Sequence, residues 1–203
     1  PYNVILDVGT YWQDKKVPDE ESCVFLEKGT LMQLRANYFP LGVETKNDML
    51  VGLYLNKNKN AKRIKEYKIW ARKFTIPAGE AEYQVEKKLT LDKPIYVRKY
   101  NFHMHHRGRA MKLSAVYPDG KSEVLISDPD YEFHHQNMYE LAKKKYLPKN
   151  TQLILTAVFD NSDKNPENPD PNINSEGVRF RPFDLYKTEM FKARLFYEDV
   201  LRN

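Results

Sequence analysis

The 203-residue sequence contains a single cysteine, Cys23, so the chain cannot form an internal disulfide bond. A lone cysteine also excludes the paired-cysteine sites that bind structural zinc. No histidine stands near Cys23 in the sequence, which favours a small core residue over a catalytic thiol. Cysteine content therefore gives no support for an oxidising compartment.

Long apolar runs and glycine-rich phosphate loops are also missing. No stretch approaches the roughly 20 consecutive apolar residues that a membrane-spanning helix needs, and no charged-then-apolar leader opens the chain. We therefore expect no membrane span in this chain. The absence of a phosphate loop disfavours nucleotide-dependent chemistry. Because the sequence begins at Pro1, we also expect a processed or partial chain.

Basic residues outnumber acidic residues by 33 to 28, and the excess lies in residues 56–73 and 143–149. The first stretch places Tyr67 and Trp70 among basic residues, a composition that can bind anions. No nucleic-acid-binding motif accompanies it. We interpret the two stretches as a solvated loop and edge strands protected by lysine, and we expect no nucleic-acid partner.

Helical periodicity is almost absent, whereas short β-rich runs recur between proline, glycine, asparagine and aspartate residues. This pattern predicts an all-β fold of the sandwich type. The expected strands span residues 30–39, 49–55, 68–74, 82–89, 95–105, 110–117, 123–127, 151–159 and 188–197.

Two connecting segments have clear turn chemistry. Tyr-Pro-Asp-Gly-Lys at 117–121 predicts a tight turn, so residues 110–127 are expected to form a hairpin. Residues 160–174 are dense in asparagine, aspartate and proline, which predicts a loop without regular structure. Its oxygen atoms could bind calcium, but without EF-hand spacing a loop of Asx turns is favoured.

All five histidines fall in two clusters, His103, His105 and His106 in one and His134 and His135 in the other. On a strand, His103 and His105 would project from one face about 7 Å apart, close enough to bind one ion. His106 would then face the other way. A His-x-His pair alone does not establish a metal site, because hydrogen-bonded or exposed histidines also occupy such positions.

A third ligand would identify the metal. The candidates are His134, His135, a carboxylate, or one of the six methionines. Imidazoles with a carboxylate favour zinc or iron, whereas imidazoles with a thioether favour cuprous copper. A methionine taken alone is more often part of the core.

A series of motifs resembles the copper type II, ascorbate-dependent monooxygenase family, which includes peptidylglycine alpha-hydroxylating monooxygenase and bacterial relatives. Ile-Pro-Ala-Gly-Glu at 76–80 and Asn-Phe-His-Met-His-His-Arg-Gly at 101–108 resemble the start of its C-terminal catalytic domain. The later motifs keep the order of the bacterial relatives and stand at 117–120, 147–149, 160–162, 168–171 and 188–190, the last being Thr-Glu-Met. The resemblance covers roughly residues 75–197.

This resemblance implies one copper ion bound by His103, His105 and Met190. Two imidazoles and a thioether stabilise cuprous copper and leave a position open for dioxygen. It also implies tandem antiparallel, jelly-roll-like β-sandwiches. Residues 1–74 would be the trailing part of an N-terminal sandwich, and residues 75–203 the C-terminal sandwich with the copper site. The implied setting is a bacterial protein of the periplasm or the extracellular space.

The chain departs from the family at the second copper, which the family holds with three histidines in the preceding domain. Asn37 stands where one of those histidines is expected, and no histidine precedes His103. Asn101 replaces the arginine that binds the peptide carboxylate in the hydroxylating enzyme. The family's second copper and its peptide clamp are therefore not expected in this chain.

Four further positions beside the expected copper site differ from the residues of the family. Lys192 and Arg194 stand where the peptide hydroxylase has asparagine and tyrosine, and this cationic lip could contact another anion. His134 and His135 replace the asparagine and tryptophan of the bacterial relatives. They are either additional metal ligands or exposed strand residues.

Two functions are compatible with these features. The chain could be an oxygen-activating copper domain that receives electrons from a redox partner, ascorbate or a missing domain. Alternatively, it could be a noncatalytic β-sandwich accessory or structural subunit of a larger cell-envelope or redox assembly, since a fold does not dictate function. Whether the chain binds copper is the observation that separates a working site from a vestige.

Overall fold

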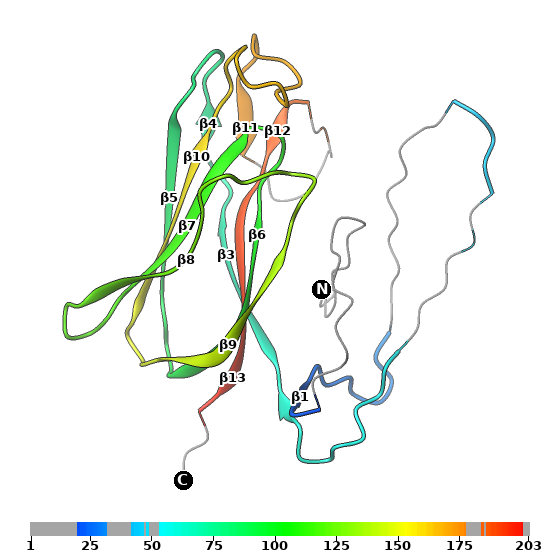
Figure 1. Ribbon diagram of the computed structural model, residues 1–203, viewed down its shortest axis with the longest axis vertical. Helices are drawn as coiled ribbons and strands as arrows, with labels where there is room; N and C mark the ends of the chain where they lie inside the picture. Colours follow the sequence, from blue (N-terminus) through cyan, green and yellow to red (C-terminus); the bar gives the residue numbers. More distant parts are fainter. Residues whose placement is uncertain are drawn as a thin grey trace. The chain divides into compact units, whose positions relative to one another are not determined.

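The computed structural model describes residues 20–31, 42–46, 48, 53–177, 184 and 186–200, and every regular element in these ranges is a β-strand (Figure 1). The described residues from Lys65 onward form one compact unit, and those before Lys65 form another. The prediction of an all-β fold is confirmed. Within the described ranges, the chain has no helix with the length and apolarity to cross a membrane.

Two four-stranded antiparallel sheets make up the larger unit (Figure 1). The β10 sheet has the order β5-β10-β7-β8, with bounds Tyr83–Thr90, Gln152–Phe159, Gly108–Val116 and Ser122–Asp128. The β6 sheet has the order β3-β13-β6-β9, with bounds Lys65–Ala71, Phe191–Asp199, Ile95–His103 and Met138–Leu147. A small third sheet joins β12 (Thr188–Glu189), β11 (Ser175–Gly177) and β4 (Thr75–Ile76).

Alternating side chains of the two large sheets build one hydrophobic core. In β10, every second residue from Leu153 to Phe159 is buried, while the residues between them are only partly buried. The central strand β13 is buried along nearly its whole length. Phe159 of β10 and Phe191 of β13 lie with ring centroids 6.3 Å apart, which brings the two sheets into contact. The larger unit is therefore a β-sandwich.

The predicted hairpin and loop are both confirmed. Strands β7 and β8 pair across a turn in which Tyr117 donates its N–H to the Lys121 carbonyl at 2.8 Å. Gly120 has a φ of 84°, in the left-handed region that glycine tolerates best. The loop at 160–174 is built from Asx turns, such as Asp160 Oδ1 accepting from the Ser162 N–H at 2.8 Å.

Several strands differ from the predicted ones. Strand β6 ends at His103, two residues earlier than expected, because the chain turns at residues 106–107. Strand β9 and the short strand β11 were not predicted. The predicted strands at 30–39 and 49–55 lie largely outside the described residues, and their described ends, 30–31 and 53–55, are not in strands.

Part of each lysine-rich stretch lies in an edge strand. Residues 65–71 form β3 and residues 138–147 form β9, which are the two outer strands of the β6 sheet. Lysine side chains on an edge discourage pairing with another chain. The placement agrees with the interpretation of these stretches as protected edges.

The smaller unit contains a short parallel pairing of β1 (Ser22–Cys23) with β2 (Lys62–Arg63). In the larger unit, β3 hydrogen-bonds to β13, so its residues share a sheet with the C-terminal strand although they precede the expected boundary at residue 74. The assignment of the preceding residues to an N-terminal sandwich stays a prediction.

Candidate metal centre

His103 is the last residue of β6, and its imidazole has a defined hydrogen-bond partner. Its Nδ1 lies 2.7 Å from Oε1 of Gln136. The Gln136 side-chain N–H donates to the Phe133 carbonyl at 2.8 Å, which orients the amide so that its oxygen faces the imidazole. Because that oxygen only accepts, Nδ1 of His103 carries the proton and Nε2 carries the lone pair.

His105 lies just beyond the strand and is buried. Its Nδ1 lies 2.9 Å from the Thr188 carbonyl oxygen. A carbonyl only accepts, so the lone pair of this imidazole is also on Nε2. The two imidazole centroids are 5.4 Å apart and the rings are inclined at 83°. The structure thus brings His103 and His105 together, although only His103 is in the strand.

Two side chains fix the backbone that carries these imidazoles. The Glu189 carboxylate accepts from the His105 N–H at 2.8 Å and from the Arg107 N–H at 2.9 Å. The Tyr131 hydroxyl accepts from the Met104 N–H at 2.9 Å and donates to the Met104 carbonyl at 2.8 Å. The segment after β6 is therefore held by side-chain hydrogen bonds instead of a sheet partner.

Arg107 is fully buried and joins this segment to two distant loops. Its Nε donates to Asn161 Oδ1 at 2.6 Å, and its Nη2 donates to the Asp170 carbonyl at 3.2 Å and to the Tyr186 carbonyl at 2.8 Å. Its Nη1 lies 3.9 Å from Glu189 Oε1, so the guanidinium and the carboxylate form a buried ion pair. Burial removes the hydration of both charged groups. The ion pair and the hydrogen bonds offset this cost.

Met190 is 4% exposed and stands between β12 and β13. Two residues before it, the Thr188 carbonyl accepts from His105. Two residues after it, Lys192 pairs in register with His103. The chain around Met190 therefore contacts the segments that carry both imidazoles.

Burial keeps the two imidazoles in their neutral form. It lowers the pKa of His103 well below its usual range, and the charge of Lys192 lowers it further. Burial also lowers the pKa of His105 to about 4, opposed by the hydrogen bond to Thr188. A neutral imidazole is the form that binds a metal ion. Burial raises the pKa of Glu189 to about 7, against the backbone N–H groups of Arg107 and His105.

The other predicted site residues have different surroundings. His135 is exposed and pairs with Glu132, whereas His134 lies beside His106 and Glu167. Lys192 and Arg194 are both buried.

These two cations also have partners within the β6 sheet. Arg194 donates to Glu66, and the Lys192 ammonium lies 5.5 Å from the centroid of the Trp70 ring. An anion contact for Lys192 and Arg194 stays a prediction.

Sequence reasoning did not identify Gln136, Glu189, Arg107 or Tyr131 as parts of this centre. Gln136 directly follows the second histidine cluster, and Glu189 directly precedes Met190. Arg107 and Glu189 also belong to the motifs at 101–108 and 188–190, but those motifs did not assign them a role. Their contacts with the His103–Gly108 segment arise from tertiary structure.

The chain matches the family model described as "Copper type II ascorbate-dependent monooxygenase, C-terminal domain" over residues 67–168, half of its length. This range includes His103 and His105 but not Met190. No curated protein matches the chain.

Similar solved structures include the infectious bursal disease virus Gt strain, with a TM-score of 0.30 and 10% identity over 76% of this chain and 41% of that chain. The VP2 subviral particle of the same virus gives a TM-score of 0.29 and 12% identity over 76% of this chain and 42% of that chain. The chain thus spans about two fifths of the viral chains. At these TM-scores the likeness carries no argument about its fold or function. It is the family match over half of the sequence that places the chain in the copper type II, ascorbate-dependent monooxygenase family, as a relative of its C-terminal domain.

Proposed function

We propose that this chain binds one copper ion through Nε2 of His103, Nε2 of His105 and the thioether of Met190. One observation carries the proposal. Each imidazole donates its Nδ1 proton to an oxygen acceptor, Gln136 Oε1 for His103 and the Thr188 carbonyl for His105. Such outer hydrogen bonds fix the tautomer and the ring orientation of metal-binding histidines.

The donor set favours the cuprous ion. Two neutral imidazoles and a soft thioether suit copper(I) better than they suit zinc, calcium or magnesium. When bound, copper would supply the one-electron chemistry with dioxygen that gives the monooxygenase family its name. The protein's own part is to hold both rings neutral, to orient them through Gln136 and Thr188, and to keep Met190 out of water.

Electrons would have to come from a partner. All five histidines of the chain lie at position 103 or later, so the three-histidine copper that the family holds in its preceding domain cannot form here in the same way. We infer a reductant outside these 203 residues, such as ascorbate, a redox protein or a further domain. The family match also supports a periplasmic or extracellular location, where such partners would be met.

An anaerobic copper(I) titration against a chromogenic chelator tests this function. We expect one tightly bound copper per chain, and we expect His103→Ala to lose it because the remaining donors cannot replace an imidazole. His135→Ala is the matched control, since His135 is exposed and paired with Glu132. Equal copper uptake by His103→Ala and His135→Ala would contradict the assignment. No uptake by the unmodified chain would favour a noncatalytic accessory subunit.

A further inference from the structure

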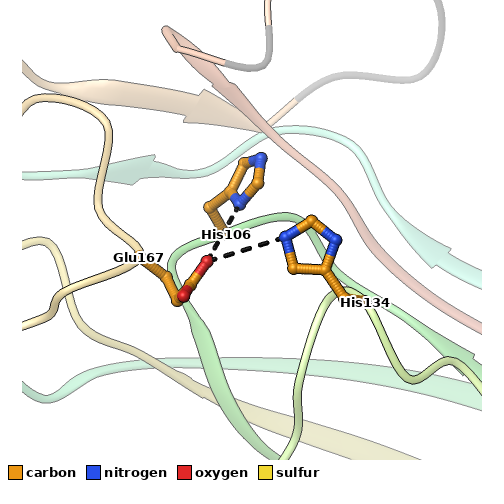
Figure 2. Close-up of side chains that lie close together, drawn as sticks. All are labelled: His106, His134 and Glu167. Carbon is orange, nitrogen blue, oxygen red and sulfur yellow. Dashed lines mark ion pairs between the residues drawn. The ribbon is translucent and has the colours of Figure 1, made fainter.

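Three side chains outside the proposed copper site converge at the loops beyond β6 (Figure 2). His106 Nδ1 lies 3.8 Å from Glu167 Oε2, and His134 Nε2 lies 3.7 Å from the same oxygen. One potential ligand atom from each residue lies within 4.8 Å of the other two. His106 belongs to the turn after β6, His134 to the turn before β9, and Glu167 to the loop at 160–174.

Buried and aromatic neighbours hold this cluster in place. Asn165 is buried, its side-chain N–H donates to the His106 carbonyl at 3.4 Å, and its Oδ1 accepts from the Glu167 N–H at 3.1 Å. The Phe133 ring centroid lies 4.4 Å from that of His106 and 5.2 Å from that of His134. The three loops therefore hold the side chains together before any ligand arrives.

The His106 imidazole directs Nδ1 toward the Glu167 carboxylate (Figure 2). Its Nδ1 is buried, and among the described residues no group hydrogen-bonds to it. At 3.8 Å the Glu167 carboxylate is too distant for a hydrogen bond, so Nδ1 of His106 can serve as a ligand atom for a cation placed between the two groups.

We propose that His106, His134 and Glu167 form a second metal site, separate from His103, His105 and Met190, which binds a divalent cation of the zinc type. Two imidazoles and one carboxylate are a common zinc donor set. Zinc bonds of about 2.0–2.2 Å place tetrahedral ligand atoms roughly 3.3–3.6 Å apart. The two His–Glu167 pairs, at 3.8 and 3.7 Å, exceed this separation by only a few tenths of an ångström.

The surroundings of the cluster fit an exchangeable ion. The His134 and Glu167 side chains are 50% and 53% exposed, so they can adjust and leave a position for water. No thioether belongs to this donor set, which disfavours cuprous copper. His135 follows His134 in the chain but pairs with Glu132, so it does not take part.

Zinc titration of the full chain against a chromogenic chelator tests the proposal. We expect one zinc ion per chain. His134→Ala and Glu167→Gln should each weaken binding by more than about 100-fold, beyond the 10–100-fold cost of losing an outer-shell partner. Both side chains are half exposed, so neither change should prevent folding. His135→Ala is the matched control and should bind zinc as the unmodified chain does.

Copper(I) uptake separates this site from the first. His134→Ala should lose zinc while its copper(I) uptake stays unchanged, whether or not the copper proposal holds. The second-site proposal is overturned if the unmodified chain binds no zinc, or if His134→Ala and His135→Ala bind it equally well. The latter result would place any bound zinc elsewhere on the chain.

Discussion

Replacing Glu189 with alanine is expected to lower the free energy of unfolding by about 3–5 kcal/mol, the cost of removing one partner from a buried ion pair. The change leaves the buried Arg107 guanidinium without its carboxylate neighbour. It also removes the acceptor for the N–H groups of His105 and Arg107.

Urea denaturation at pH 8 measures this effect. Burial raises the pKa of Glu189 to about 7, so at pH 8 the side chain is mainly a carboxylate. Glu86→Ala is the matched control: Glu86 is exposed and pairs on the surface with Lys88 at 3.1 Å, so its loss should cost less than about 1 kcal/mol. Similar losses in the two variants would show that the Glu189 contacts do not stabilise the fold.

Copper-loaded protein is expected not to hydroxylate a glycine-extended peptide over many turnovers. Asn101 stands where the resemblance expects the arginine that binds the peptide carboxylate. The Asn101 side chain is buried, and it donates to the Asn137 carbonyl at 3.1 Å. Losing the orientation of a substrate raises the barrier by several kcal/mol.

The supply of electrons is the stronger reason for this expectation. No histidine precedes His103, so the family's second copper cannot form from these residues and the family's route for the second electron is missing from this chain. The assay supplies ascorbate, oxygen and the peptide, and measures oxygen uptake and hydroxylated product. Oxygen reduction without product agrees with the expectation, whereas product in large excess over protein contradicts it.

Features that depend on nearby residues could be predicted from the sequence. The Pro118-Asp119-Gly120 turn carries its own conformational preferences, and strands β7 and β8 follow from it. The apolar run of β10 likewise predicted a strand, although its alternation of buried and partly buried residues appears only in the structure. Strand β9 could not be predicted in this way, because its run of lysines hides the alternation and its extended form depends on pairing with β6.

In the candidate site, too, nearby residues predict some features and contacts between distant residues determine the others. His103 and His105 could be paired from their spacing, but the strand that was expected to align them ends at His103. Hydrogen bonds from Glu189 and Thr188, far along the chain, orient His105 instead. The cluster of His106, His134 and Glu167 joins three loops, and no local pattern in the sequence brings those loops together.

X-ray absorption of the copper(I)-loaded chain tests the central claim most directly, because it identifies the donor atoms around the metal. We expect a first shell with two imidazole nitrogens and one sulfur, and we expect Met190→Leu to lose the sulfur while both nitrogens remain. Met190 is buried, and leucine has a similar volume, so the variant should fold. A first shell without sulfur in the unmodified chain, or an unchanged sulfur signal in Met190→Leu, would contradict the copper site at His103, His105 and Met190.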